Sequence, residues 1–191
     1  MPARHTPSGN EVPSNKFDLT SLAELQRRET PLALRRLLEL QHMPVVGKFD
    51  AAHLQAIHKY IFQDVYDWAG EFRTVNISKP NALFPPPEHL KAGLSALLGE
   101  LAAEDLLKGL SLAAWVHRAA YYLGEINAIH PFREGNGRTQ REFIRQLAAA
   151  DGHVLAWRQT LPQQMIEASQ QSFLRKDYRG LERILRDALG A

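Results

Sequence analysis

The chain has 191 residues, of which 45% are hydrophobic and 23% are charged, and it contains no cysteine. A chain of this length can bury enough surface to form one domain with a sizeable core. The absence of Cys excludes a disulfide framework, a thiolate nucleophile and any Cys-based metal centre. The charges nearly balance, with 23 Lys and Arg against 21 Asp and Glu. This composition does not indicate a general binder of nucleic-acid backbones, so any polyanion must be recognised at one local site.

The ends and charge spacing of the chain indicate neither a membrane protein nor a secretory signal. The longest stretch without Asp, Glu, Lys or Arg is the 9 residues from Gly109 to His117, which is too short to cross a bilayer as a helix. Residues 1–16 hold three prolines, and Val12 is their only sizeable apolar side chain after Met1, so we expect a flexible tail followed by one domain over residues 17–191. The tail lacks an apolar stretch after its basic residue. We therefore expect a cytoplasmic protein, or one delivered by a route that needs no such signal.

Apolar side chains recur at helical spacing along most of the domain. Pro31 interrupts the first such pattern and suits the first turn of a new helix with Thr30 as its N-cap. Apolar residues three or four apart from Leu54 to Trp68 predict a helix that ends near Gly70. Later helices are predicted over residues 88–107, 111–126, 137–150, 162–174 and 178–189.

One segment follows the strand period instead. Residues 72–78 alternate and are rich in β-branched side chains, and residues 82–84 follow after a turn signal. The three prolines that come next limit the second arm to a short edge strand, because proline cannot donate a ladder hydrogen bond. The sequence therefore predicts an all-α protein with one β-hairpin.

Residues 130–141, His-Pro-Phe-Arg-Glu-Gly-Asn-Gly-Arg-Thr-Gln-Arg, concentrate the groups that can carry chemistry. Pro131 disfavours helix at His130, so the preceding helix should end there. Asn136, between two glycines, is a suitable N-cap for a helix that runs from Gly137 to about Ala150. The free N–H groups and the positive end of the dipole at that helix start are suited to bind phosphate.

Charged side chains beside this helix start indicate phosphoryl or nucleotidyl transfer. Arg138 and Arg141 share one face near the predicted anion site, and Glu134 could hold Mg²⁺ together with phosphate oxygens. His130 could accept a proton from an attacking hydroxyl. Each fragment taken alone is more often structural: a turn, a helix stop or a solvated charge. Their combination within one loop is far more specific.

The same residues resemble the signature of the Fic-domain family, His-Pro-Phe-x-[Asp/Glu]-Gly-Asn-Gly-Arg-x-x-Arg, at every specified position. The resemblance covers about residues 50–160, and the predicted hairpin resembles the family's flap. It implies an all-α, Fic-type helical bundle with one β-hairpin flap. It also implies an enzyme that moves AMP from ATP to a Ser, Thr or Tyr hydroxyl of a target protein.

This resemblance implies a role for each matched residue. His130 would be the base, Glu134 the ligand of Mg²⁺ and Phe132 a buried anchor for the loop. The residues that would hold the phosphates of ATP are Gly135, Asn136, Gly137, Arg138 and Arg141. The flap of the family receives an extended segment of the target by strand addition. The residues placed at that edge are Val75, Asn76, Ile77 and Ser78.

The resemblance also bears on regulation. Family members are commonly inhibited by a helix with the pattern [Ser/Thr]-x-x-x-Glu-[Gly/Asn], whose Glu pairs with the second arginine of the motif. The nearest match is Thr20 to Glu24, which is followed by Leu25 and is better interpreted as an ordinary helix start. We therefore expect a separate small antitoxin to supply the Glu. Similar toxins modify the ATPase subunits of DNA gyrase and topoisomerase IV, which makes these proteins the expected targets.

Two alternatives remain open at this point. The chain could be a catalytically idle module that binds nucleotide or protein through the same loop, or it could transfer another group that contains phosphate. Gly137 favours AMP over phosphate, because the phosphate-transferring relatives have Lys at that position. A direct contact with nucleic acid is disfavoured, because Glu142 lies beside Arg141 and Arg145 and the overall charge is balanced.

Overall fold

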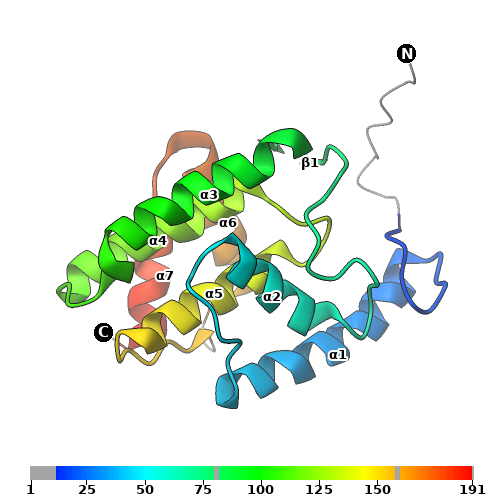
Figure 1. The fold of residues 1–191 in the computed structure, drawn as a ribbon, viewed down its shortest axis with the longest axis horizontal. Helices are drawn as coiled ribbons and strands as arrows, with labels where there is room; N and C mark the ends of the chain where they lie inside the picture. Colours follow the sequence, from blue (N-terminus) through cyan, green and yellow to red (C-terminus); the bar gives the residue numbers. More distant parts are fainter. Residues whose placement is uncertain (1–11, 80–81, 158–159, 191) are drawn as a thin grey trace.

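The computed structural model describes residues 12–79, 82–157 and 160–190, and these are nearly all helical (Figure 1). A 3-10 turn, Asp105–Leu107, lies between the third and fourth helices. Two short strands, β1 (Ser78–Lys79) and β2 (Ala82–Leu83), pair antiparallel. The helices are α1 (Leu22–His42), α2 (Ala51–Phe62), α3 (Pro87–Ala103), α4 (Leu112–Ile129), α5 (Asn136–Ala150), α6 (Pro162–Arg175) and α7 (Arg179–Leu189).

Helix α4 is the centre of the bundle. It contacts α3, α5, α6 and α7, while α2 joins α1 to α5 on the other side (Figure 1). The helix predicted from residue 111 is confirmed: Ser111 caps its start, accepting a hydrogen bond from the Ala114 N–H. Large side chains such as Trp115 and Tyr122 are fully buried along it. Because both ends of α4 are fixed by this packing, the residues that follow it begin from a rigid support.

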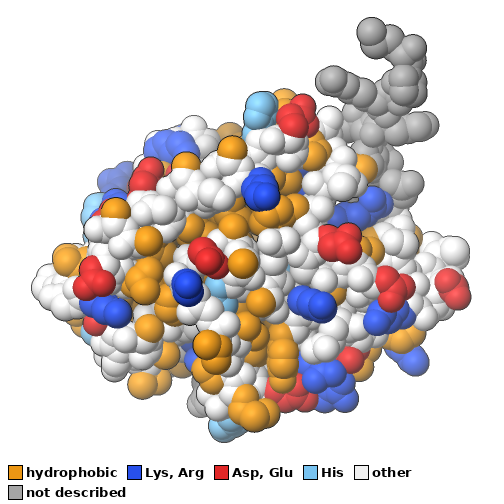
Figure 2. Space-filling model, in the orientation of Figure 1, with side chains coloured by type: hydrophobic (Ala, Val, Ile, Leu, Met, Phe, Trp, Pro, Cys, Tyr) orange, Lys and Arg blue, Asp and Glu red, His pale blue; other side chains and the backbone are white. Residues whose placement is uncertain are grey.

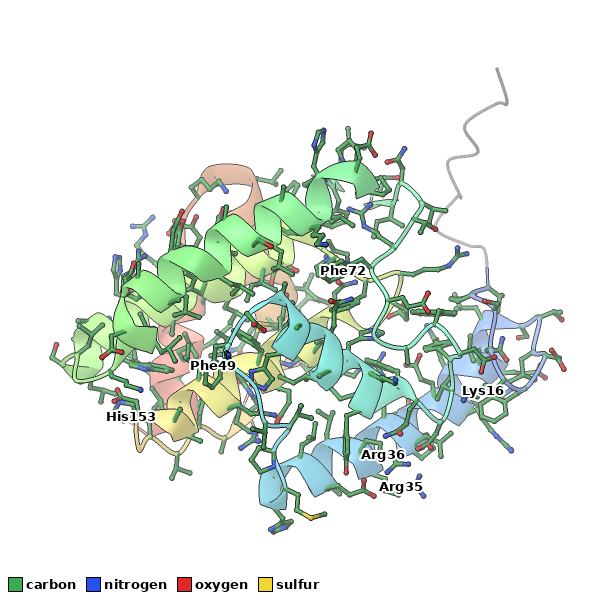
Figure 3. All side chains as sticks on the ribbon, in the orientation of Figure 1. Lys16, Arg35, Arg36, Phe49, Phe72 and His153 are labelled. Carbon is green, nitrogen blue, oxygen red and sulfur yellow. The ribbon has the colours of Figure 1, made fainter. Side chains whose placement is uncertain are left out.

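Side chains from the connections complete the core between α1, α2 and α5 (Figure 3). Phe49, just before α2, meets Phe143 of α5 edge to face, with ring centroids 5.5 Å apart. Arg36 of α1 donates from Nε to a carboxylate oxygen of Asp64 at 2.8 Å, just beyond the end of α2. The first contact holds the entry to α2 against α5, and the second holds α1 against the end of α2.

Helix α1 corrects one prediction. Thr30 does not cap a new helix, because α1 runs unbroken past Pro31. Pro31 lies on the exposed face, so the carbonyl that its missing N–H leaves unpaired can be hydrated. Thr30 instead donates its hydroxyl to the Gln26 carbonyl at 2.8 Å. The opposite face of the helix stays continuously packed through Leu25, Ala33 and Leu40.

The hairpin and α2 are both shorter than predicted. Helix α2 ends at Phe62, and turns carry the chain on to Gly70. The strand expected over residues 72–78 begins only at Ser78, which pairs with Leu83. Residues 72–77 have no ladder partner among the described residues, because Arg73 makes its hydrogen bonds to the end of α4 instead. We call residues 72–79 and 82–85 the hairpin segment.

The described part of the expected tail, residues 12–16, is packed and not free. Residues 1–11 lie outside the described residues. Residues 12–16 pack against the bundle: the Lys16 N–H donates to the Val65 carbonyl at 2.9 Å, and the Trp68 indole donates to the Ser14 carbonyl at 2.9 Å. Pro13 is buried. The chain is therefore held against the bundle from residue 12 by hydrogen bonds to an indole and to the backbone. Amino-acid composition alone does not indicate these partners.

The surface of the bundle carries both signs of charge. Lys, Arg, Asp and Glu side chains are interspersed with apolar ones on the face shown in Figure 2, in keeping with the balanced composition. Among the helices described, none combines the length and the apolar character needed to span a membrane.

Candidate active site

The predicted base, His130, lies at the C-terminal end of α4 and is only 7% exposed. Its backbone is left-handed, with φ 49°, and its N–H donates to the Ile126 carbonyl at 3.1 Å. The ring atom Nδ1 is 3.2 Å from the carbonyl oxygen of Asn127. A carbonyl can only accept, so Nδ1 carries the proton and Nε2 keeps its lone pair in the neutral ring. The fold thus assigns the tautomer in which Nε2 can act as a base.

Asn136 fixes the loop that follows, although not as the sequence predicts. Gly135 is the N-cap of α5, and Asn136 is the first helical residue instead of its cap. The Asn136 side chain pairs with the backbone of Phe132, accepting from its N–H at 2.9 Å and donating to its carbonyl at 2.7 Å. The oxygen and the nitrogen of that amide thus both close the loop on itself.

Phe132 and His58 form the buried floor of this loop. The two rings are stacked, with centroids 3.9 Å apart and planes 16° from parallel. His58 Nε2 lies 3.0 Å from the Glu134 carbonyl, and its Nδ1 accepts from the Gly70 N–H at 2.8 Å. Burial, and secondarily the charge of Arg138, lower the pKa of His58 to about 4. A neutral imidazole therefore holds the loop from beneath.

Gly135 is required by two features of the turn. Its φ is +78°, and a Cβ there would lie 2.3 Å from ring atoms of Phe62. A Cβ on Gly137 would meet Arg141 Nη1 at 3.3 Å, a tight contact with a flexible side chain. Packing against Phe62 thus requires glycine at position 135, whereas glycine at position 137 leaves space beside the Arg141 side chain.

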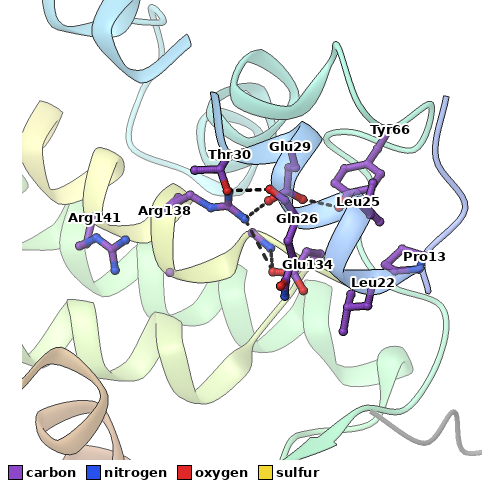
Figure 4. Close-up of a pocket in the computed structure, with 12 residues that line it drawn as sticks. Pro13, Leu22, Leu25, Gln26, Glu29, Thr30, Tyr66, Glu134, Arg138 and Arg141 are labelled. Atoms are coloured by element: carbon purple, nitrogen blue, oxygen red, sulfur yellow. Dashed lines mark hydrogen bonds and ion pairs between the residues drawn. The ribbon is translucent and has the colours of Figure 1, made fainter. Parts of the chain in front are cut away.

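A pocket of about 460 Å³ opens over this helix start (Figure 4). It brings together the loop, α5 and the first turns of α1. The lining residues from α5 and the loop are Glu134, Gly135, Gly137, Arg138 and Arg141, and those from elsewhere are Pro13, Leu22, Leu25, Gln26, Glu29, Thr30 and Tyr66. Five of the predicted site residues therefore share one cavity.

The two arginines of the motif have different surroundings. Arg138 pairs with Glu29 of α1, with N and O 2.5 Å apart, and lies 3.8 Å from Glu134 (Figure 4). Glu29 also accepts a hydrogen bond from the Tyr66 hydroxyl, whose pKa is raised by burial and by that carboxylate. Arg141 makes no ion pair within the described residues, and burial and the neighbouring Arg138 lower its pKa. Arg141 is therefore a desolvated cation that faces the pocket.

The residues predicted for the flap lie apart from this pocket. Val75, Asn76 and Ile77 are half-buried and irregular, and only Ser78 belongs to a strand. The Val75 carbonyl accepts from Arg73 Nη1 at 2.9 Å. The hairpin segment still reaches the base, because Phe84 stacks on the His130 ring with centroids 4.0 Å apart.

Sequence reasoning missed Glu29, Tyr66, His58, Arg73 and Phe84, all of which support the loop or its charges. Buried acids and arginines are rare without partners, so a charged residue inside an apolar helical pattern, such as Glu29 between Leu25 and Ala33, was the available signal. Its partner, Arg138, lies more than a hundred residues away, so no local feature of the sequence indicates that the two residues pair.

A helical bundle with a glycine-containing turn and two arginines between and along its core helices defines the class of this protein, and comparisons with known proteins give its family. Residues 48–148 match the Fic/DOC family. The protein adenylyltransferase VbhT of Bartonella schoenbuchensis is 43% identical over 159 residues, which are 83% of this chain. The probable protein adenylyltransferase Fic of Escherichia coli K12 is 34% identical over 149 residues, or 78% of this chain. The chain belongs to the Fic/DOC family.

The likeness extends to solved structures. The crystal structure of BepC, a VirB-translocated effector of Bartonella tribocorum with bound AMPPNP, is similar with a TM-score of 0.87 and 25% identity, over 95% of this chain and 94% of that one. The matched region makes up 33% of VbhT and 74% of the E. coli protein.

Substituting Gly135 tests the packing of the turn. We expect Gly135→Ala to lower the free energy of unfolding by about 2–4 kcal/mol, because a positive φ and a clash with Phe62 add up. Gly152→Ala is the matched control, since Gly152 has the same φ of +78° but nothing within 4 Å of a Cβ. It should lose only about 1 kcal/mol in urea unfolding. Equal losses for the two variants would contradict the packing argument.

His58 makes stability depend on pH. Its pKa of about 4 in the folded protein lies below the ordinary 6.5, so the unfolded chain takes up the proton first. Stability should therefore fall as pH drops from 6.5 to 4, by about 1.4 kcal/mol per pH unit and about 3 kcal/mol in all. His58→Gln can still donate to the Glu134 carbonyl but does not titrate. If the unfolding free energies of both proteins change in parallel over this range, His58 is not buried neutral.

Proposed function

We propose that the chain is a protein adenylyltransferase that moves AMP from ATP to a Ser, Thr or Tyr hydroxyl of a target protein. One observation carries this proposal: a single turn joins an imidazole whose Nδ1 faces a carbonyl, which leaves Nε2 as its basic atom, to a helix start that carries two arginines. The description of VbhT and E. coli Fic as protein adenylyltransferases, the latter a probable one, supports the activity, and the AMPPNP bound to BepC supports a nucleoside triphosphate as the donor.

The proposed reaction is a nucleophilic substitution at the α-phosphorus of ATP. The hydroxyl oxygen of the target forms a bond to the α-phosphorus of ATP, and its proton passes to His130 Nε2. The bond between the α-phosphorus and the bridging oxygen of the β-phosphate breaks, and pyrophosphate leaves. Charge then accumulates on the departing phosphates, where the N-terminal N–H groups of α5, Arg138 and Arg141 would stabilise it. Fixed donors of this kind need no rearrangement during the reaction.

Glu134 would hold Mg²⁺. Its side chain is half exposed at the pocket, and one oxygen accepts from the Gly135 N–H at 2.8 Å. The described part of the chain offers no group of three His, Cys, Asp or Glu that could form an all-protein cage. A lone carboxylate beside phosphate oxygens and water fits Mg²⁺, which would neutralise phosphate charge when bound. We propose this role for Glu134 on that fit.

The hairpin segment would bind the target as a flap. Its ladder joins only two residues in each arm, and Leu83 is 79% exposed beside it. An extended peptide can add to such a short edge by backbone hydrogen bonds. The edge residues proposed for this contact are Val75, Asn76, Ile77 and Ser78.

We further propose control by a separate antitoxin, with the ATPase subunits of DNA gyrase and topoisomerase IV as targets and the cytoplasm as the site of action. A carboxylate from that antitoxin would pair with Arg141, which is desolvated and has no ion-pair partner in the described ranges. Such a pair would displace the phosphate nearest to Arg141. The targets rest on the family resemblance alone.

One observation favours the idle binding module as a second candidate. Arg138 already pairs with Glu29, so an incoming phosphate must share or replace that partner. If the ion pair persists, nucleotide could bind without productive alignment. The two candidate functions differ in whether AMP is transferred to a target protein.

Labelled ATP separates them. The protein is incubated with Mg²⁺, a cell lysate and ATP labelled at either the α- or the γ-phosphate. We expect transfer of the α-label to protein, and its loss in His130→Ala by about 100-fold or more, because the hydroxyl then lacks its base. Transfer of the γ-label alone would indicate phosphorylation, and no transfer of either label would indicate the idle module. His153→Ala, which changes a histidine beyond α5, is the control and should keep the wild-type rate.

A further inference from the structure

Arg73 connects the hairpin segment to the end of α4. Its side chain is buried, with the residue 4% exposed. Nε donates to the His130 carbonyl at 2.8 Å, and Nη2 reaches the Ile129 carbonyl at 3.5 Å. The Arg73 backbone N–H donates to the Pro131 carbonyl at 2.9 Å. Three consecutive carbonyls, centred on the proposed base, thus accept from one residue.

The same guanidinium joins the two arms of the hairpin segment. Nη1 donates to the Val75 carbonyl at 2.9 Å, and Nη2 donates to the Pro85 carbonyl at 2.6 Å. Phe84, next to Pro85, stacks on the His130 ring with planes 19° from parallel. The hairpin segment therefore holds His130 twice, through its carbonyl and through its ring.

The chemistry of this contact suits arginine and no other side chain. The last carbonyls of a helix lack intrahelical partners and lie at the negative end of the dipole. A planar guanidinium offers five donors in a fixed fork, so it can serve several carbonyls that point in different directions. Burial disfavours the charge and lowers the pKa of Arg73, and the carbonyl oxygens compensate with hydrogen bonds. A lysine could satisfy only part of this set.

His130 needs such a restraint. A left-handed backbone with φ 49° is unfavourable for a residue with a side chain, and it persists only where the surroundings enforce it. We propose that Arg73 is a positioning residue, through which the hairpin segment fixes the backbone of His130 and presents Nε2 to the target hydroxyl. The proposal deepens the proposed function and rests on it. It also means that a target bound to the hairpin segment contacts the element that aligns the base.

The test compares Arg73→Lys with Arg145→Lys. Arg145 is also partly buried and donates to a carbonyl near a helix end, that of Leu40, but it joins α5 to α1. Transfer of α-labelled AMP to a fixed amount of lysate protein is measured against ATP concentration. Two-dimensional NMR of protein with ¹⁵N-labelled histidine follows the imidazole of His130. Phe84→Leu is a second variant, which removes the stacked ring and keeps an apolar side chain.

We expect Arg73→Lys to lower kcat about 10- to 100-fold while the KM for ATP stays within about twofold, because the base is misplaced and the anion site is intact. The His130 imidazole signals should shift in Arg73→Lys and Phe84→Leu and stay in place in Arg145→Lys. A folded Arg73→Lys protein with wild-type kcat and unshifted His130 signals would overturn the proposal. If the wild-type chain transfers no AMP, the proposed function fails, and the His130 signals alone decide whether Arg73 positions this ring.

Discussion

The turn between α4 and α5 constrains the rest of the site, because its backbone is left-handed at both ends. His130 and Gly135 each have a positive φ, and the residues between them are held by the Asn136 amide and by the stack of Phe132 on His58. At His130 this conformation is unfavourable and depends on packed neighbours, whereas Gly135 adopts it readily because it has no Cβ. As a result, the imidazole at one end and the helix start at the other keep a fixed relation, which is the preorganisation that charge stabilisation requires.

Charge is arranged around this turn in an unequal way. Arg138 is neutralised by the buried Glu29, while Arg141 remains without an ion-pair partner in the region described. Two unpaired arginines at a helix start would repel each other and the positive end of the dipole, and the carboxylate of Glu29 reduces this repulsion. The near-balanced net charge of the chain conceals this local field. The positive charge at the pocket therefore comes from the placement of a few side chains and not from composition.

Much of this arrangement could be predicted from the sequence, because it depends on local signals. The helix stop before Pro131, the glycine at position 135 and the capping Ser111 all act within a few residues. The rest depends on distant partners. Pro31 remains inside α1 because the packing of this helix outweighs the unfavourable free energy of a proline in a helix. Arg73 does not form the predicted strand because its N–H groups donate to carbonyls at the end of α4. Asn136 was expected as a cap, yet its amide has better partners in Phe132.

Calorimetric titration in the presence of Mg²⁺ tests most directly whether the start of α5 binds the phosphates of ATP. ATP and adenosine are titrated into the wild-type protein, Arg141→Ala and the control Arg145→Ala. ATP should bind the wild-type protein at least about tenfold more tightly than adenosine, and Arg141→Ala should remove most of that difference while Arg145→Ala keeps it. Equal affinity of the wild-type protein for ATP and adenosine would contradict the claim.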